Sequence, residues 1–135
     1  MPDRKTLGRA RKDKRAGKSP STEAGEFVHE EIKHIREGKH GARSTKQAIA
    51  IGLSKARRAG MTLKPPSPST TSARTRKAAA RDERAGQKKR SHKPSARRAK
   101  ASLRKLKGEP RGVVSHAALS RHAKAVARRK RSAGA

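Results

Sequence analysis

Large apolar side chains are scarce in this chain, whereas positive charge is abundant. Phe, Ile, Leu and Val together account for 15 of the 135 residues, and Lys and Arg number 39 against 10 Asp and Glu. The formal net charge of +29 opposes compaction, because like charges in a folded chain repel one another. Alanine supplies most of the remaining apolar residues and favours helices, but contributes little burial energy. The composition therefore predicts a small helical core with disordered or conditionally helical flanks.

The residue types that are missing exclude several function classes. The chain has no cysteine, tryptophan or tyrosine, and its one aromatic side chain is Phe27. Disulfide and thiolate chemistry is thereby excluded, as is the stacking of bases on aromatic rings that is typical of single-strand binders. No catalytic motif is present, and we expect no enzyme, no cofactor and no small-molecule substrate. Without an apolar run long enough for a signal peptide or membrane span, we expect a cytoplasmic, nucleoid-associated protein.

Acidic residues are concentrated in segment 21–37, which contains five of the ten in the chain. Val28, Ile32 and Ile35 recur within it at the spacing of one helix face. Gly38 follows, and glycine is the residue best suited to a helix end. This pattern predicts a helix over about 22–37.

A second helix is predicted over about 44–59. Ser44 and Gln47 have the spacing of a capping box, and Gly60 and a following Pro-Pro pair end the pattern. Two such helices joined by a short loop form an αα-hairpin. The apolar face of a module over 21–64 is small, so we expect a homodimer or a protein partner to stabilise this hairpin.

Basic segments flank the predicted hairpin on both sides. Residues 1–20 are predicted to be a disordered basic arm, and 65–72 a linker rich in proline and serine. The tail over 73–135 contains three stretches of alanine, lysine and arginine that serine residues precede. Repulsion between neighbouring cations weakens such helices, and bound phosphate would remove it. The helices predicted in this tail are 73–85, 95–107 and 115–131.

Runs of basic residues are the strongest functional signal, since they form the electrostatic footprint of nucleic-acid binding. They indicate a polyanionic partner and carry no information about base sequence. The candidate nucleic-acid contacts are Arg43, Lys46, Arg57, Arg58, Lys88, Lys89, Arg90, Arg97, Arg98, Lys100, Arg104, Lys105, Arg121, Lys124, Arg128, Arg129, Lys130 and Arg131. The histidines that lie among basic residues and are assigned as supplementary phosphate contacts are His40, His92, His116 and His122.

His29 and His34 form a pair that resembles a metal motif. A zinc-protease helix needs histidines four residues apart, so that both rings lie on one face. Here the second histidine is one residue further along, which separates the two rings by about 140° around a helix. We therefore expect no metal site.

Residues 44–57 read Ser-Thr-Lys-Gln-Ala-Ile-Ala-Ile-Gly-Leu-Ser-Lys-Ala-Arg. With Glu26 and Phe27 upstream, they resemble a small uncharacterised family of bacterial, archaeal and phage proteins. The pattern of that family is Lys-Gln-Ala-Ile-Ala-Ile, then glycine or alanine, then Leu-Ser-x-Ala-Arg. The resemblance covers about 25–64 and implies no activity or site. The tail is similar, in composition alone, to the tails of linker histones and histone-like proteins.

The main functional hypothesis is nucleic-acid binding without sequence specificity, in DNA packaging or nucleoid association. RNA or ribosome association is the alternative, and DNA is the favoured partner. A third class is an interaction module in which the hairpin binds a protein and the tail binds DNA. Apolar stripes at 99–106 and 119–126 would permit binding to an anionic membrane, but they lack aromatic anchors, and we expect no membrane partner.

Overall fold

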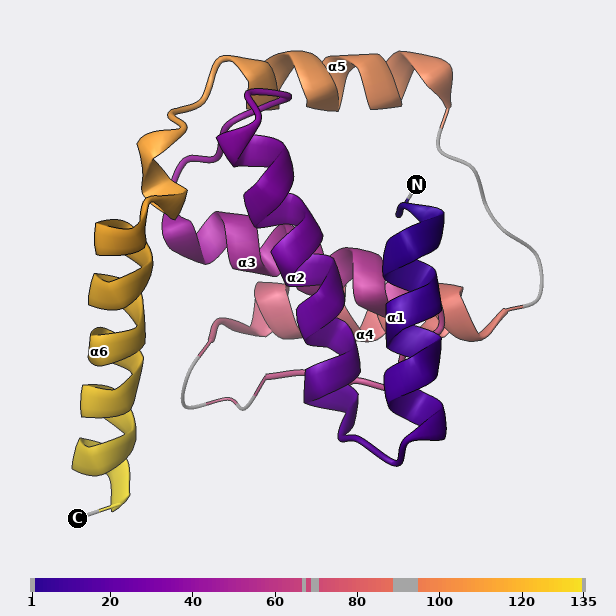
Figure 1. Cartoon of the computed structure of the whole chain (residues 1–135), viewed down its shortest axis with the longest axis vertical. Coiled ribbons are helices and arrows are strands. Elements are labelled where there is room, and N and C mark those ends of the chain that lie inside the picture. The colour runs from indigo at the N-terminus through magenta and orange to yellow at the C-terminus, as the bar shows by residue number, and fades with distance from the viewer. Residues whose placement is uncertain (1, 67, 69–70, 89–94, 135) are drawn as a thin grey trace. The chain divides into compact units, whose positions relative to one another are not determined.

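The computed structural model describes residues 2–66, 68, 71–88 and 95–134. Within these residues it contains six α-helices, one short 3₁₀ helix and no strand, which confirms the predicted all-α class (Figure 1). The elements are α1 (Arg4–Arg15), α2 (Pro20–Arg36), α3 (Thr45–Arg58), α4 (Ala73–Gln87), α5 (Ala96–Lys107), η1 (Gly112–Val114) and α6 (His116–Gly134). The five helices predicted from the sequence correspond to α2 to α6, with bounds close to those predicted.

Serine side chains cap the start of five of these helices. In each case the hydroxyl oxygen accepts a hydrogen bond of 3.1–3.3 Å from the backbone N–H three residues further on. Such a cap satisfies one of the free N–H groups of the first turn and stabilises a helix by about 1 kcal/mol. The capping residues are Ser19, Ser44, Ser72, Ser95 and Ser115. Each of these five helices therefore begins next to a serine that accepts a hydrogen bond from a backbone N–H of its first turn.

Glycine ends α2 and α3 at the predicted positions. Gly38 and Gly60 have φ angles of +80° and +96°, in the left-handed region where a side chain would be strained. After α2, the Lys39 N–H donates to the His34 carbonyl at 3.0 Å, and after α3 the Met61 N–H donates to the Ala56 carbonyl at 3.1 Å. These bonds satisfy carbonyls of the last turn that the helix itself leaves without partners.

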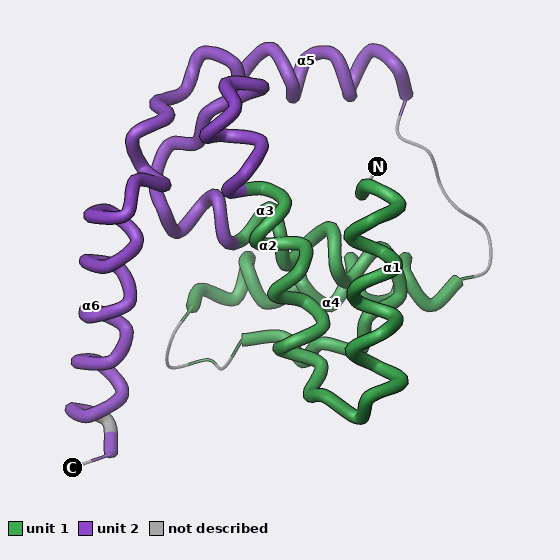
Figure 2. The backbone as a smooth tube through the Cα atoms, in the orientation of Figure 1, with its two compact units in different colours: residues 1–31, 50–94 green, residues 32–49, 95–135 purple. Residues whose placement is uncertain are grey.

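The chain forms two compact units (Figure 2). Unit 1 contains Met1–Glu31 and Ala50–Pro94, and unit 2 contains Ile32–Ile49 and Ser95–Ala135. Both α2 and α3 therefore contribute one part to each unit. The sequence predicted a separate module over 21–64, and the structure divides the chain differently because apolar residues continue along both helices and meet different partners at each end.

The core of unit 1 surrounds the single aromatic side chain. Phe27 of α2 is fully buried, together with Ala10 of α1 and Ala56 of α3. Met61 and Leu63, which follow α3, fold back onto this cluster. Small alanines around one phenylalanine allow the helix backbones to approach closely.

Helix α1 replaces the disordered arm that the sequence predicted over 1–20. Ala10 is fully buried and Thr6 is 2% exposed, while Leu7 packs against the core of unit 1. The Asp3 N–H also donates to the Glu30 carboxylate at 2.6 Å. The arm is helical in the structure because these residues cover part of the Phe27 cluster, which α2 and α3 alone leave open.

Helix α4 is fastened to α3 by a buried carboxylate. Asp82 is 8% exposed, and it accepts hydrogen bonds from Ser54 Oγ at 2.7 Å and from Arg58 Nε at 2.9 Å. Further along, a Cβ added to Gly86 would lie 1.8 Å from the Arg57 carbonyl oxygen. The end of α4 therefore packs directly on the backbone at the end of α3.

We predict that Asp82→Ala lowers the free energy of unfolding by about 1–2 kcal/mol, because it leaves two donors on α3 without their acceptor. The neighbouring Glu83→Ala is the matched control, since it removes the same charge from the same helix. Urea unfolding followed by circular dichroism measures both changes. Equal losses in the two variants would show that the Asp82 contacts add nothing beyond net charge.

The core of unit 2 holds the segment before α6 against the loop between α2 and α3. Ile35, Ala42, Ala48 and Val114 are fully buried, and Ile32 and Val113 pack against them. Backbone bonds join the same segments: Gly41 N–H donates to the Leu106 carbonyl at 2.8 Å, and Ala42 N–H to the Pro110 carbonyl at 2.9 Å. This small core fixes the end of α5 and the start of α6.

Candidate nucleic-acid interface

Half of the acidic side chains are buried. Half of the ten in the chain are less than 9% exposed: Asp13, Glu23, Glu30, Glu31 and Asp82. Several pair with cations of their own unit, as Asp13 does with Lys18 at 2.8 Å and Glu31 with Lys55. The hydrogen bond and charge of Asp13 raise the pKa of Lys18. All five buried carboxylates belong to unit 1, so none of them offsets the positive charge of unit 2 from within that unit.

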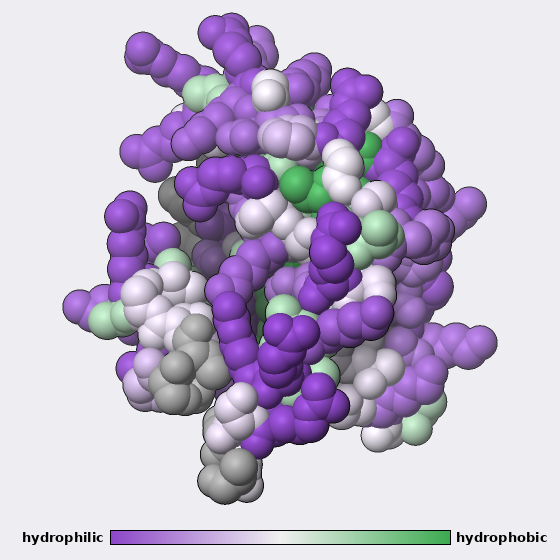
Figure 3. Space-filling view, turned by 90° about the vertical axis from the view of Figure 1, so that its left-hand side faces the viewer, coloured by the Kyte–Doolittle hydropathy of each residue, from purple (hydrophilic) through white to green (hydrophobic). Residues whose placement is uncertain are grey.

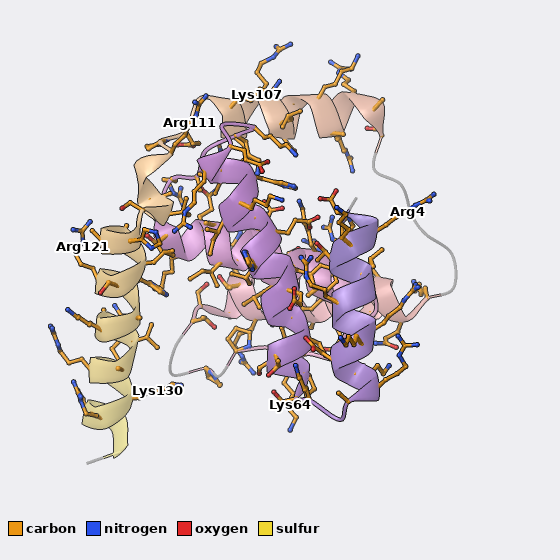
Figure 4. All side chains as sticks on the ribbon, viewed as in Figure 1. Arg4, Lys64, Lys107, Arg111, Arg121 and Lys130 are labelled. Atoms are coloured by element: carbon orange, nitrogen blue, oxygen red, sulfur yellow. The ribbon has the colours of Figure 1, made fainter. Side chains whose placement is uncertain are left out.

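The candidate cations of α5 and α6 lie on open surface. No residue of α5 is buried, and α6 is anchored through its first turns, where Ala118 is 7% exposed. Figure 4 shows side chains ending in nitrogen along both helices, with Lys107, Arg121 and Lys130 labelled. The exposed candidates on these two helices are Arg97, Arg98, Lys100, Arg104, Lys105, Arg121, Lys124, Arg128, Arg129, Lys130 and Arg131.

Hydrophilic residues also cover most of the face shown in Figure 3, where hydrophobic residues appear only in small patches. Leu103 of α5 is the large apolar side chain that stands out among the described residues, at 43% exposed. Between Ser95 and Ala135 the sequence has 13 lysines and arginines and one acidic residue, Glu109. This part of the chain therefore offers many cations with a single carboxylate to compete for them.

Arg57 and Arg58 are adjacent in sequence, but the structure separates their roles. Arg57 is 7% exposed, and its guanidinium donates to the Leu63 and Lys64 carbonyls at 3.4 and 3.1 Å. Burial lowers its pKa. Arg58 keeps a side chain that is 60% exposed while donating to Asp82. Of the two candidates, Arg58 faces solvent, whereas Arg57 holds the chain that follows α3.

The start of α3 presents two further candidates. Arg43 and Lys46 are exposed, one before the helix and one in its first turn. The predicted capping box is present in one direction: Ser44 caps the Gln47 N–H, but the Gln47 side chain accepts from the Arg43 N–H at 2.6 Å instead of from that of Ser44. This bond holds the chain before α3 in place.

The structure brings Lys46 together with Arg121 and His122 of α6. All three line one open groove of unit 2. The sequence did not predict this grouping, because Lys46 lies far from the two α6 residues along the chain. A different candidate, Lys88, is exposed at the end of α4. Lys89 and Arg90 lie outside the described residues.

The histidines divide into several environments. His40 is 6% exposed and its Nδ1 bonds with the Gly41 carbonyl at 2.9 Å, so it belongs to the loop of unit 2. Its ring lies edge-on to that of His34, with ring centroids 6.3 Å apart, an approach that the sequence did not predict. His29 is exposed on α2, and His116 is exposed at the start of α6. His92 lies outside the described residues.

Comparison with known families finds a match over less than half of the chain. Residues 11–67 match a family of unknown function (DUF6496). The match includes all of α2 and α3, and with α3 the motif of residues 44–57, but it takes in only the last five residues of α1. No curated protein and no solved structure shows significant similarity to the chain. In the part of the chain that the structure describes, every helix is too short or too polar to cross a bilayer.

Proposed function

We propose that this protein binds nucleic acid through backbone phosphates, largely without regard to base sequence, and that it acts in DNA packaging or nucleoid association. One observation supports this most directly: half of the acidic residues are buried, whereas Arg57 is the one buried residue among the described lysines and arginines. With this one exception, the described lysines and arginines stand where the phosphates of a polymer can reach them. Such a surface attracts phosphate polymers and releases their counterions.

The expected lack of sequence preference follows from the kinds of side chain available. Base readout requires donors, acceptors or stacking surfaces placed against base edges. The single aromatic residue, Phe27, is fully buried and cannot stack on a base. The exposed candidates are spread over α3, α5 and α6 and are not gathered on one recognition helix. Contacts of this kind position a protein on a duplex without reading it.

The test is a titration of fluorescently labelled duplexes at several salt concentrations. The logarithm of affinity should fall linearly with the logarithm of salt concentration, by about 0.9 for each phosphate neutralised. If about a third of the 39 basic residues engage at once, the slope is about −12. A slope near zero would contradict a phosphate-based mode.

A panel of unrelated duplexes at fixed, near-physiological salt tests whether binding is independent of base sequence. Affinities should agree within about a hundredfold, because a larger preference, about 2.7 kcal/mol, requires base-edge or shape readout. Matched RNA duplexes in the same panel distinguish the DNA role from RNA or ribosome association. Stronger binding to RNA than to every DNA duplex would overturn the packaging role while leaving phosphate binding intact.

A further inference from the structure

Unit 2 contains an open groove of about 590 Å³ between the start of α3 and the start of α6. Ser44, Thr45 and Lys46 line it from the α3 side, and Arg121 and His122 line it from α6. No acidic residue is among its lining residues. The groove therefore combines two cations, an imidazole and the Ser44 hydroxyl, a set of donors that matches a phosphate group.

The walls of the groove are held by contacts within unit 2. The Thr45 hydroxyl donates to the Val113 carbonyl, which fastens the first turn of α3 to η1. Arg36 Nε donates to the Val114 carbonyl at 3.1 Å, and the Val114 side chain is fully buried. Ser115 caps the first turn of α6. Because both helix starts are fixed to the same short segment, the backbone needs little ordering to present their side chains to one ligand.

Gly112 leaves one side of the groove open. It lines the groove, and a Cβ added to it would meet no atom within 4 Å. Its φ angle is not positive, so the backbone there tolerates a side chain. The groove thus has room for a ligand beside η1, and this position can receive a new charge without disturbing the fold.

We propose that this groove binds one phosphate group of the nucleic-acid backbone and so fixes the polymer at a defined point of unit 2. The proposal rests on the proposed function, to which it adds a site. Lys46 and Arg121 supply the charge that a phosphodiester requires, and an arginine can also donate two parallel hydrogen bonds to it. His122 and the Ser44 hydroxyl supply further polar contacts. The cations along α5 and the far end of α6 then bind the neighbouring phosphates without a fixed geometry.

Nuclear magnetic resonance of the ¹⁵N-labelled full chain tests the groove directly. Inorganic phosphate and a short DNA duplex are titrated separately, and amide shifts are followed at Ser44, Thr45, Lys46 and Gly112. Both ligands should shift these amides more than those of α5. Phosphate shifts that are spread evenly over α5 and α6 would overturn the site.

A charge-addition variant provides the mutational test. Gly112→Glu places a carboxylate in the groove, and Gly8→Glu is its matched control, because Gly8 is exposed on α1 and also has no atom within 4 Å of an added Cβ. Both variants lower the net charge equally. Gly112→Glu should abolish the phosphate shifts and weaken duplex binding about tenfold more than Gly8→Glu. Equal affinities for the two variants would overturn the proposal.

Two double variants that remove cations test the groove without the risk that Gly112→Glu changes the fold. Lys46→Gln with Arg121→Gln removes the two groove cations, and Arg97→Gln with Lys100→Gln removes two exposed cations of α5. The groove pair should lose about tenfold more duplex affinity than the α5 pair. If both pairs lose the same affinity, the groove proposal fails and diffuse binding stands. If the groove amides respond to inorganic phosphate while no duplex binds, nucleic-acid binding fails and the groove is a site for small phosphate compounds.

Discussion

Replacing Gly52 with leucine is expected to unfold unit 1. A Cβ added to Gly52 would lie 2.6 Å from Val28 Cα and 2.9 Å from Val28 N, which are backbone atoms of α2. No rotation of a neighbouring side chain relieves such a contact, so α2 and α3 would have to separate. Ala56, one turn further along α3, packs in the Phe27 cluster and would be drawn out with it. We expect a loss of roughly 3 kcal/mol or more in the free energy of unfolding.

Gly8→Leu is the matched control for this prediction. Gly8 lies on the exposed side of α1, and an added Cβ there meets nothing within 4 Å. Leucine favours helix over glycine by up to about 1 kcal/mol, so this variant should be as stable as the parent or more stable. Urea unfolding and hydrogen exchange of the unit 1 amides measure both variants. Protected amides around Phe27 in Gly52→Leu would contradict the close packing of α2 on α3.

The helices were predictable because their signals are local. Ser72, Ser95 and Ser115 each precede a run of helix-favouring residues, and the structure confirms each as a cap. Gly38 and Gly60 end α2 and α3 for a reason that is also local, the positive φ angle. Caps and turns depend on neighbours within a few residues, so the sequence contains all the information they need.

The packing of α1 was not predictable in the same way. Its sequence is dominated by charged residues, and a single pair, Leu7 and Ala10, gives it an apolar side. Whether that pair is buried depends on Phe27, which lies in another helix. An isolated basic helix of this length is marginal in water, and tertiary contacts decide whether it forms. The sequence therefore favoured a disordered arm that the structure replaces with a helix.

The candidate nucleic-acid interface also depends on contacts between residues that are distant in sequence, which the sequence alone did not predict. Arg57 and Arg58 are indistinguishable as a basic pair, yet consecutive residues on a helix point about 100° apart. In the structure one guanidinium is buried against carbonyls and the other reaches Asp82. Likewise, Lys46 and Arg121 meet in one groove only because Val113 and Val114 fix η1 to the start of α3. Composition predicts that cations bind, and tertiary structure selects which ones act together.

Replacing Arg128, Arg129, Lys130 and Arg131 with alanine is expected to weaken duplex binding by up to about a thousandfold at near-physiological salt. All four are exposed near the end of α6, and alanine favours the helix, so the fold should be retained. The loss of four phosphate contacts should also flatten the salt dependence by about 3–4 in slope. Fluorescence anisotropy at several salt concentrations measures both quantities, and circular dichroism checks the helix.

The matched control removes four exposed cations from the end of α1: Arg11, Lys12, Lys14 and Arg15. The net charge falls equally, but we expect a smaller loss of affinity. Acidic side chains of unit 1 lie close to this helix, since Asp13 belongs to it and Glu26 pairs with its Arg9 at 2.5 Å. The end of α6 has no acidic residue in its sequence neighbourhood. Equal losses from the two quadruple variants would show that net charge alone governs binding and that the C-terminal helices have no special share in it.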